Sequence, residues 1–255
     1  MIPGILATVF LLSLFIFIPT AEGDENSFSY IWGGYGTSLL TRSPEQRHNT
    51  LMAVRDINGT IIAPGAVFSF NALVGARDTA KGYTAAPIID SKGEMLDSPG
   101  GGICQLASTI YNAGLLAGLQ VIERHPHSRT VGHVPTGRDA TISSWRKDLK
   151  LKNPFSYPLQ LKIETGQSRL TASFCATVAC PFTVEIKTER TRLEPETVIR
   201  GSGGRIIQKG GTGYSAVTRR FTRQGTAISE EIISTDTYPA PSRVIGKDAS
   251  QGGIE

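Results

Sequence analysis

The fold is decided by residues 99–119, which read PGGGICQLASTIYNAGLLAGL. Apolar residues recur there at three- and four-residue spacing and also occupy the flanks, which predicts a helix surrounded by protein that ends near Gly118. Three glycines before the helix permit positive φ angles and a close approach of the backbone. The stretch therefore predicts that Cys104 lies at the start of a buried helix, where the N–H groups and the helix dipole favour a thiolate over a thiol.

Two interpretations of Cys104 follow from its place in this stretch. A nucleophilic cysteine would be put at such a helix start, and Gly101, Gly102 and Gln105 beside it would then contact a substrate. Alternatively, Cys104 is a small core hydrophobe, which is the commonest fate of a free cysteine. The stretch alone does not separate the two.

Length and composition limit the remaining choices. With 255 residues and 40% hydrophobic content, the chain can form one large or two small domains with a proper core. The formal net charge of +4 is mild and is not concentrated in a Lys/Arg block, so we expect no nucleic-acid partner. An anionic cell envelope suits this charge.

The N-terminal segment predicts a location outside the cytoplasm. Residues 2–19 carry no charge and are followed by Ala21-Glu22-Gly23. This pattern indicates an export signal over residues 1–23 with a small-residue cleavage site, or an uncleaved membrane anchor through residues 2–20. Either way, we expect the protein to be secreted or held at the outer face of the membrane.

The three cysteines agree with that compartment. Cys175 and Cys180 are five residues apart, and an oxidising environment would join them in a disulfide. Cys104 is then left over, either buried and inert or kept for chemistry.

Hydrophobic periodicity predicts an α+β domain with an antiparallel sheet, followed by a small all-β unit. Ser43-Pro44-Glu45 predicts the start of a helix that ends at Asn58-Gly59. Strands are expected near residues 60–62, 67–70, 88–89, 120–125 and 140–143, with a hairpin from 159–163 and 170–174. Past Cys180 the helical signal disappears, and residues 201–213 are expected to form a glycine-rich loop.

Short motifs in one order resemble the VanW-like family, bacterial envelope proteins named for a member of a glycopeptide-resistance cluster. They are Arg47-His48-Asn49, Asn58-Gly59-Thr60, residues 64–71, Gly75-Ala76-Arg77, residues 100–105, 124–128, 137–141 and 148–153. The resemblance implies a VanW-like domain over residues 36–175. Residues 182–248 are similar to the glycine-marked G-five β module of surface proteins that meet peptidoglycan or glycans, which suggests adhesion to a cell-wall polymer.

A thiol nucleophile needs a base and a group that orients the base. Three histidines, His125, His127 and His133, follow the central helix and precede Asp139. The order Cys, His, Asp is that of transglutaminase-like and papain-like enzymes. The sequence resembles the transglutaminase-like pattern in more features, although the gap between histidine and aspartate is shorter here than in that pattern. We choose His127 as the base and Asp139 as its orienting group, with His133 in reserve.

Two other interpretations of these residues stay open. His127 and Asp139 could be hydrogen-bonded structural or ligand-binding residues, because only geometry identifies a triad. Cys104 with two of the histidines could ligate zinc, although we expect neither a metal nor a cofactor.

Two arginines complete the predicted site. A fork-shaped guanidinium suits a carboxylate, such as the terminal group of a cell-wall stem peptide, which makes Arg77 and Arg138 candidates for ligand binding. The sequence thus predicts Cys-dependent amide or ester chemistry on peptidoglycan stem peptides, or else a non-catalytic module that binds peptidoglycan or glycan.

Overall fold

The computed structural model describes residues 28–90, 94–144, 146–200 and 206–246. The predicted export signal or anchor over residues 1–23 lies outside the described residues. Among the residues that are described, no helix is both long and apolar enough to cross a membrane.

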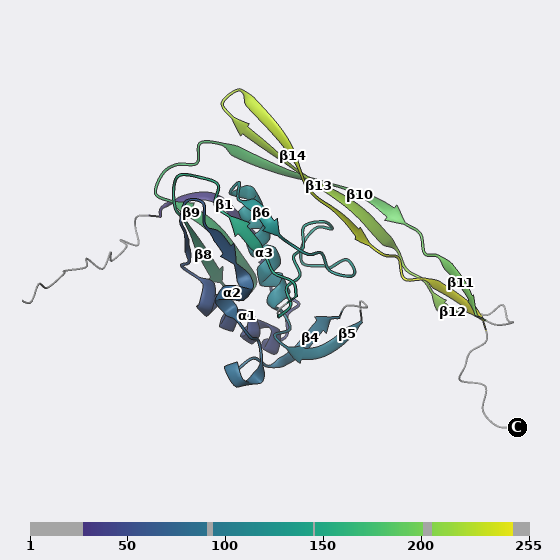
Figure 1. Ribbon diagram of the computed structural model, residues 1–255. Helices are drawn as coiled ribbons and strands as arrows, with labels where there is room; N and C mark the ends of the chain where they lie inside the picture. Colours follow the sequence, from purple (N-terminus) through teal and green to yellow (C-terminus); the bar gives the residue numbers. More distant parts are fainter. Residues whose placement is uncertain (1–27, 91–93, 145, 201–205, 247–255) are drawn as a thin grey trace, which may run out of the picture.

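The elements of the first part of the chain surround one long central helix (Figure 1). They are β1 (Tyr30–Ser38), α1 (Pro44–Ile57), β2 (Ile61–Ile62), β3 (Val67–Ser69), α2 (Phe70–Val74), the 3₁₀ turn η1 (Thr79–Lys81), β4 (Ala85–Ile89), β5 (Met95–Pro99), α3 (Ile103–Leu116), β6 (Gln120–Glu123), β7 (Lys150–Lys152), β8 (Leu159–Thr165) and β9 (Arg169–Ala176).

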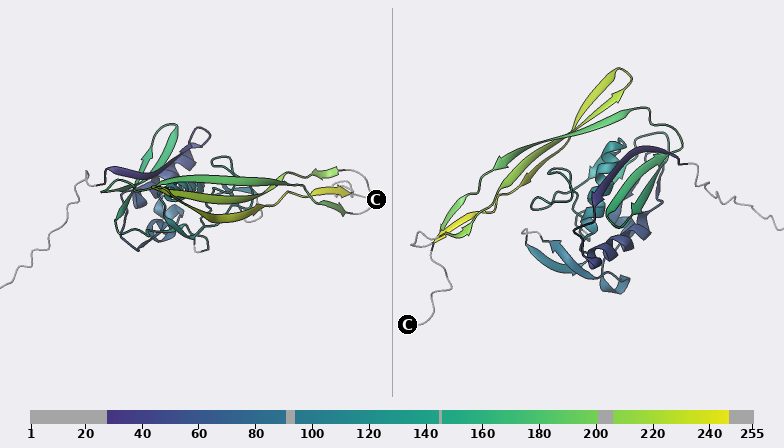
Figure 2. Two further views of the ribbon diagram at one scale, coloured as in Figure 1. Left: turned by 90° about the horizontal axis from the view of Figure 1, so that it is seen from above. Right: turned by 180° about the vertical axis from the view of Figure 1, so that it is seen from behind.

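The last part of the described chain contains strands alone. They are β10 (Thr183–Leu193), β11 (Thr197–Arg200), β12 (Ile206–Lys209), β13 (Gly213–Gln224), β14 (Ala227–Tyr238) and β15 (Arg243–Gly246). The three long strands pair as an antiparallel sheet β10-β13-β14, and the three short strands pair as β11-β15-β12. Together they form a long, narrow blade beside the rest of the molecule (Figures 1 and 2).

The core lies between α3 and the four-stranded sheet β1-β9-β8-β2. Leu106, Ile110 and Ala113 of α3 are fully buried, as their periodicity predicts. The helix ends at Leu116, and Gly118 follows with φ +75°, a conformation that favours glycine. Burying an apolar helix on all sides removes a large apolar area from water, so this contact holds the domain together.

Helix α1 begins and ends where its sequence signals predict. The Ser43 side chain accepts a hydrogen bond from the Gln46 N–H, and the Gln46 side chain returns one to the backbone of Ser43, which is a capping box. Asn49 on the inner side of α1 donates to the carbonyl of Gly101 at 3.0 Å. This bond fixes the glycine turn in front of α3 to a second helix.

The β4–β5 hairpin stands beside the glycine turn and leads directly into it (Figure 1). On the other side of α3, β6 continues the chain and pairs with β7, which pairs with β3. The long segment between β6 and β7 contains no strand other than an isolated bridge between Ser143 and Lys147, within the residues described there. That segment and the hairpin border the N-terminal end of α3.

The predicted fold class is wrong. Strands make up 45% of the chain and helices 17%, in three α-helices among the described residues, so the molecule is mostly antiparallel sheet rather than α+β. The described chain also has no papain-like helical core, and the transglutaminase- or papain-like analogy fails at the level of fold. Helical periodicity is confined to short stretches, whereas the named elements of the described chain from β8 onward are all strands, paired into sheets.

Two local expectations also differ from the structure. Residues 140–143 form no strand, because the Ala140 N–H donates to the Ser108 hydroxyl and ties the segment to α3 instead of to a neighbouring strand. The expected loop over residues 201–213 contains the strand β12 in its described part. The division of the chain near residues 175–182 stays a prediction.

We expect Gly33→Ala to lower the free energy of unfolding by about 2–3 kcal/mol. A Cβ at this position of β1 would lie 2.2 Å from the backbone nitrogen of Ala117, so the strand or the end of α3 must move. Chemical denaturation of both proteins measures the difference. Gly132→Ala is the control, because nothing lies within 4 Å of its added Cβ; equal losses in the two variants would contradict the close packing.

Candidate functional site

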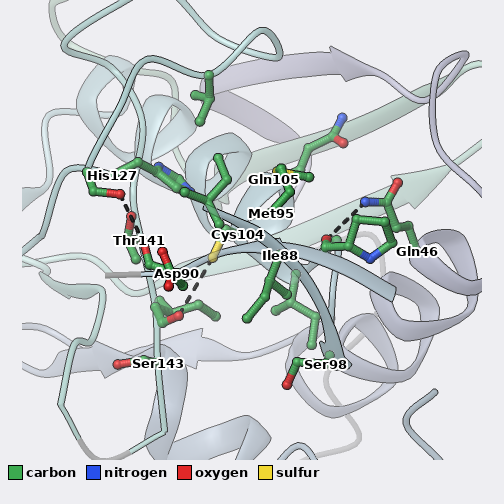
Figure 3. Close-up of a pocket in the computed structure, with 18 of the residues that line it drawn as sticks. Gln46, Ile88, Asp90, Met95, Ser98, Cys104, Gln105, His127, Thr141 and Ser143 are labelled. Atoms are coloured by element: carbon green, nitrogen blue, oxygen red, sulfur yellow. Dashed lines mark hydrogen bonds between the residues drawn. The ribbon is translucent and has the colours of Figure 1, made fainter. Parts of the chain in front are cut away.

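A cavity of about 700 Å³ opens at the N-terminal end of α3 (Figure 3). Its lining comes from the start of α1, both strands of the hairpin, the glycine turn and the segment after β6. Five cationic side chains are among the lining residues: Arg42, Arg77, Arg129, Arg146 and Lys147. The carboxylate in the lining is that of Asp90, so the charge of the described wall favours an anionic ligand.

Cys104 lies in the first turn of α3 and is partly exposed. Gly102 in front of it adopts φ +101°, and a Cβ there would lie 2.7 Å from the backbone oxygen of Gln46. Glycine is therefore required both for the turn and for its packing on α1. The thiol donates to the carbonyl of Ile142 at 3.6 Å, and the first-turn N–H groups point toward the same end of the helix.

The structure brings Cys104, His127 and Asp139 together. Asp139 Oδ2 accepts from His127 Nδ1 at 2.5 Å and from the His127 backbone N–H at 2.7 Å. His127 also interacts with the Cys104 thiol, and this interaction contributes to the pKa shifts of both groups. His127 is 6% exposed and Asp139 is 1% exposed. A thiol, an imidazole and a carboxylate thus form a chain from the cavity to the interior.

The electrostatics of this chain favour a thiolate and an imidazolium. Burial disfavours ionisation of Cys104, but hydrogen bonding and charge interaction with His127, the Ile142 contact and the charge of Arg77 together lower its pKa. Burial likewise opposes the charge on His127, whereas its bonds to Asp139 and Cys104 give a net raised pKa. Burial alone would raise the pKa of Asp139. The hydrogen bond from His127 and the charge of Arg124 outweigh burial and lower this pKa to about 2.

The other two candidate histidines, His125 and His133, have different contacts from those of His127. His125 is bonded through Nε2 to Glu123 at 3.0 Å and does not line the cavity. His133 lines the cavity, but burial and then the positive charges of Arg42 and His127 lower its pKa to about 3, so it is neutral. Its Nδ1 accepts from Arg42, at 3.3 Å. Of the three histidines, His127 is the one that bonds to Asp139 and interacts with Cys104.

The predicted ligand-binding residues divide into two groups. Arg77, Gly102 and Gln105 line the cavity with Cys104, whereas Gly101 and Arg138 do not. Arg138 instead donates to Asn112 at 2.6 Å and lies over the ring of Tyr35.

Gln105 and Arg77 differ in what their polar atoms contact. The Gln105 amide donates to Thr37 Oγ1 and the carbonyl of Ser38 and accepts from Arg42, so its hydrogen-bonding groups serve the fold. Arg77 holds Asn71 through Nη1, while its buried Nη2 has no partner among the described residues. An unpaired guanidinium nitrogen beside the thiol is a group that a bound anion can satisfy.

Sequence reasoning missed several residues of the site. Arg42 stands one residue before the N-cap of α1 and showed no motif. Arg124 was part of a family motif, but Asp236 and Tyr238, more than 90 residues further along the chain, were not singled out. Asp236 and Tyr238 are buried in a strand that is otherwise largely exposed, and no pattern in the sequence marks them.

All three cysteines are free in the structure, so the expected Cys175–Cys180 disulfide is not formed there. Cys175 pairs across β1 with the exposed Ile31, on the outer face of the sheet. Cys180 packs against the core cluster on the other face, and its thiol contacts the carbonyl of Phe182. The two side chains therefore belong to opposite faces, which a spacing of five residues does not reveal.

The fold and site define a mostly antiparallel β protein with a cysteine-bearing central helix. The chain belongs to the VanW-like family, whose model matches residues 45–175. This confirms the resemblance seen in the sequence. Asp236 and Tyr238 lie outside the matched range.

Two curated relatives support the assignment. An uncharacterized protein of Bacillus subtilis, YoaR, is 41% identical over 130 residues, which is 51% of this chain and 43% of YoaR. The vancomycin B-type resistance protein VanW of Enterococcus faecalis is 27% identical over 214 residues, which is 80% of this chain and 74% of that protein. The chain thus spans less than half the length of YoaR and about three quarters of VanW.

Two solved structures match 26% of this chain. The G5 domain of an IgA1 protease is 23% identical, with 87% of its chain covered and a TM-score of 0.23. The G5 domain of HP0197 is 16% identical, with 97% covered and a TM-score of 0.21. Both carry the name of the module that residues 182–248 are expected to resemble.

Alkylation of the denatured protein without reductant should label all three cysteines, because the structure contains three free thiols. Mass spectrometry of the peptides counts the labelled positions. A protein treated with reductant first is the control. Labelling of Cys104 alone, with Cys175 and Cys180 joined, would show that the disulfide forms in the mature protein.

Cys104 of the native protein should react with iodoacetamide at a lower pH than an ordinary thiol does. Its pKa is lowered by the pair with His127, so the thiolate is present above the shifted pKa and is lost as the pH falls through it. In His127→Ala the reaction should move to higher pH. Rates are measured by peptide mass, with partly buried Cys180 as the internal reference; superimposable profiles for Cys104 in the two proteins would refute the pair.

Proposed function

We propose that the protein is a cysteine-dependent enzyme of the cell envelope that transfers or hydrolyses an acyl group of a carboxylate-bearing substrate. The observation that carries the proposal is that Cys104 and His127 line the same cavity and interact electrostatically, while Asp139 is bonded to His127 behind the wall. Nucleophile, base and orienting carboxylate are there in the order that thiol catalysis needs.

The proposed reaction has two balanced steps. The Cys104 sulfur bonds to the carbonyl carbon of an amide or ester, the C–N or C–O bond breaks, and the leaving group takes a proton from His127. Water or a second amine then attacks the thioester, gives its proton to His127 and releases the thiolate. Asp139 stays ionised and holds the imidazole, and first-turn N–H groups of α3 stabilise the oxyanion.

The lining of the cavity supports a substrate with a carboxylate. Arg77 offers a buried, unpaired nitrogen near the thiol, and Arg42 and Arg146 add positive charge around it. The terminal carboxylate of a peptidoglycan stem peptide has this chemistry, and the family resemblance points to the cell envelope. We extend the proposal to a location outside the cytoplasm and to peptidoglycan, or another cell-wall polymer, as partner.

A non-catalytic module that binds peptidoglycan or glycan is the second candidate. The same cationic lining would hold a carboxylate without any reaction, and the sequence resemblance of residues 182–248 to a glycan-associated module favours adhesion. In that case Cys104 serves packing. The two candidates differ in what removal of the sulfur does.

Purified protein incubated with peptidoglycan fragments should change their masses and show a transient acyl adduct on Cys104. Cys104→Ser should lower turnover by on the order of 10³-fold or more and still bind the fragments. Mass spectrometry follows both the fragments and the protein. Cys180→Ser is the matched control, since that thiol lies outside the cavity lining.

The opposite result is equally specific. Unchanged fragments, no adduct, and equal binding by wild type and Cys104→Ser would leave the binding module as the function.

A further inference from the structure

We propose that strand β14 belongs to the catalytic site: Tyr238 and Asp236 hold Asp139 and Arg124 in the arrangement from which Asp139 orients His127. The inference rests on the proposed function. It assigns positioning roles to two residues outside the range that the family model matches.

The first contact is between Tyr238 and Asp139. The Tyr238 hydroxyl, 99 residues away in the chain, donates to Asp139 Oδ1 and is itself the acceptor of the Gly137 N–H at 3.0 Å. Tyr238 is 1% exposed. Because Oδ2 of the same carboxylate is used by His127, the hydroxyl restrains rotation of Asp139 on the side away from the imidazole.

The second contact is the pair between Arg124 and Asp236. Arg124 Nη1 lies 2.5 and 2.6 Å from the two oxygens of Asp236, while its Nη2 lies 3.0 Å from Asp139 Oδ1. The guanidinium is nearly inaccessible to water and lies over the Tyr111 ring. One buried cation is thus shared by two carboxylates, one from each side of the contact with β14.

The charge balance explains why this sharing matters. With Asp236 present, Arg124 is compensated by β14, and the charge of Asp139 remains available to the imidazolium. Without Asp236, Asp139 is the carboxylate that remains to pair with Arg124, and the positive charge of Arg124 beside His127 is less compensated. The imidazolium then becomes less favourable, and less imidazolium means that the Cys104 thiolate forms at higher pH.

The titratable and charged groups that face this cluster come from every element packed on it. They are Tyr111 of α3, Arg124 after β6, His127 and Asp139 of the following segment, Asp236 and Tyr238 of β14, and on the cavity side Cys104, His133, Arg42 and Arg77. His133 is neutral, and the two cavity arginines are unaltered by substitutions in β14. A change of β14 therefore reports on Arg124 and Asp139.

The test is the pH dependence of Cys104 alkylation by iodoacetamide in the full chain. Asp236→Asn should move the midpoint of the profile upward by roughly one pH unit. Tyr238→Phe, which removes one oxygen, should move it in the same direction by less, because Asp139 can then turn toward Arg124 and away from His127.

Glu231→Gln is the matched control. Glu231 lies on the same strand and pairs with an arginine as Asp236 does, at 2.6 Å from Arg220, but it is 56% exposed and far from the cluster in the sheet register. Its profile should coincide with that of the wild type. Circular dichroism and thermal melting confirm that each variant is folded.

The outcomes separate the inference from the proposed function. An ordinary thiol profile in the wild type overturns the proposed function. A low midpoint in the wild type, with coincident profiles for folded Asp236→Asn and Tyr238→Phe, overturns the inference alone. Loss of the fold in both variants also overturns it, since the contacts would then serve stability rather than positioning.

Discussion

The buried charge of Asp139 is the constraint on which the arrangement of several distant segments depends. A carboxylate that is 1% exposed is costly unless it is compensated, and here a cation, an imidazole, a backbone N–H and a phenol all do so. Removing any one partner leaves the others with an unmet charge or donor. The arrangement is therefore a set of mutually dependent contacts, and it links segments that are far apart in the sequence.

Contacts with distant segments also fix the glycine turn before α3. Gly101 packs its backbone against Ala86 and Gly102 against Gln46, so the hairpin and α1 both come within a distance that excludes a Cβ. The start of α3 is therefore fixed on two sides, and so is the position of Cys104 in its first turn. The cavity owes its shape to the turn and its charge to arginines that arrive from other parts of the chain.

Local signals in the sequence were sufficient for the parts that depend on neighbouring residues. The capping box of α1, the buried stripe of α3 and the hairpin of β8 and β9 were all predictable, because their residues interact within a few positions. The pairing of Cys104 with His127 and Asp139 was also suggested by residue type. Its geometry was not predictable, since the intervening segment is irregular and is held by single bonds to α3.

What the sequence did not reveal is long-range. The α+β assignment gave two clear helices more weight than many short alternating stretches. The cysteine spacing suggested a bridge, but strand alternation puts Cys175 on the outer face. Arg42, Asp236 and Tyr238 have meaning through partners 63 to 112 residues away, and no periodicity records such a contact.

That distance along the chain has a consequence for the order of assembly. Chains emerge from the ribosome from the N-terminus onward, at about 5–20 residues per second. Cys104, His127 and Asp139 are all made well before Tyr238, whose hydroxyl completes the shell around the carboxylate. The shell around this carboxylate is therefore complete only after β14 has been made and has paired with the rest of the chain, in whichever compartment the chain folds.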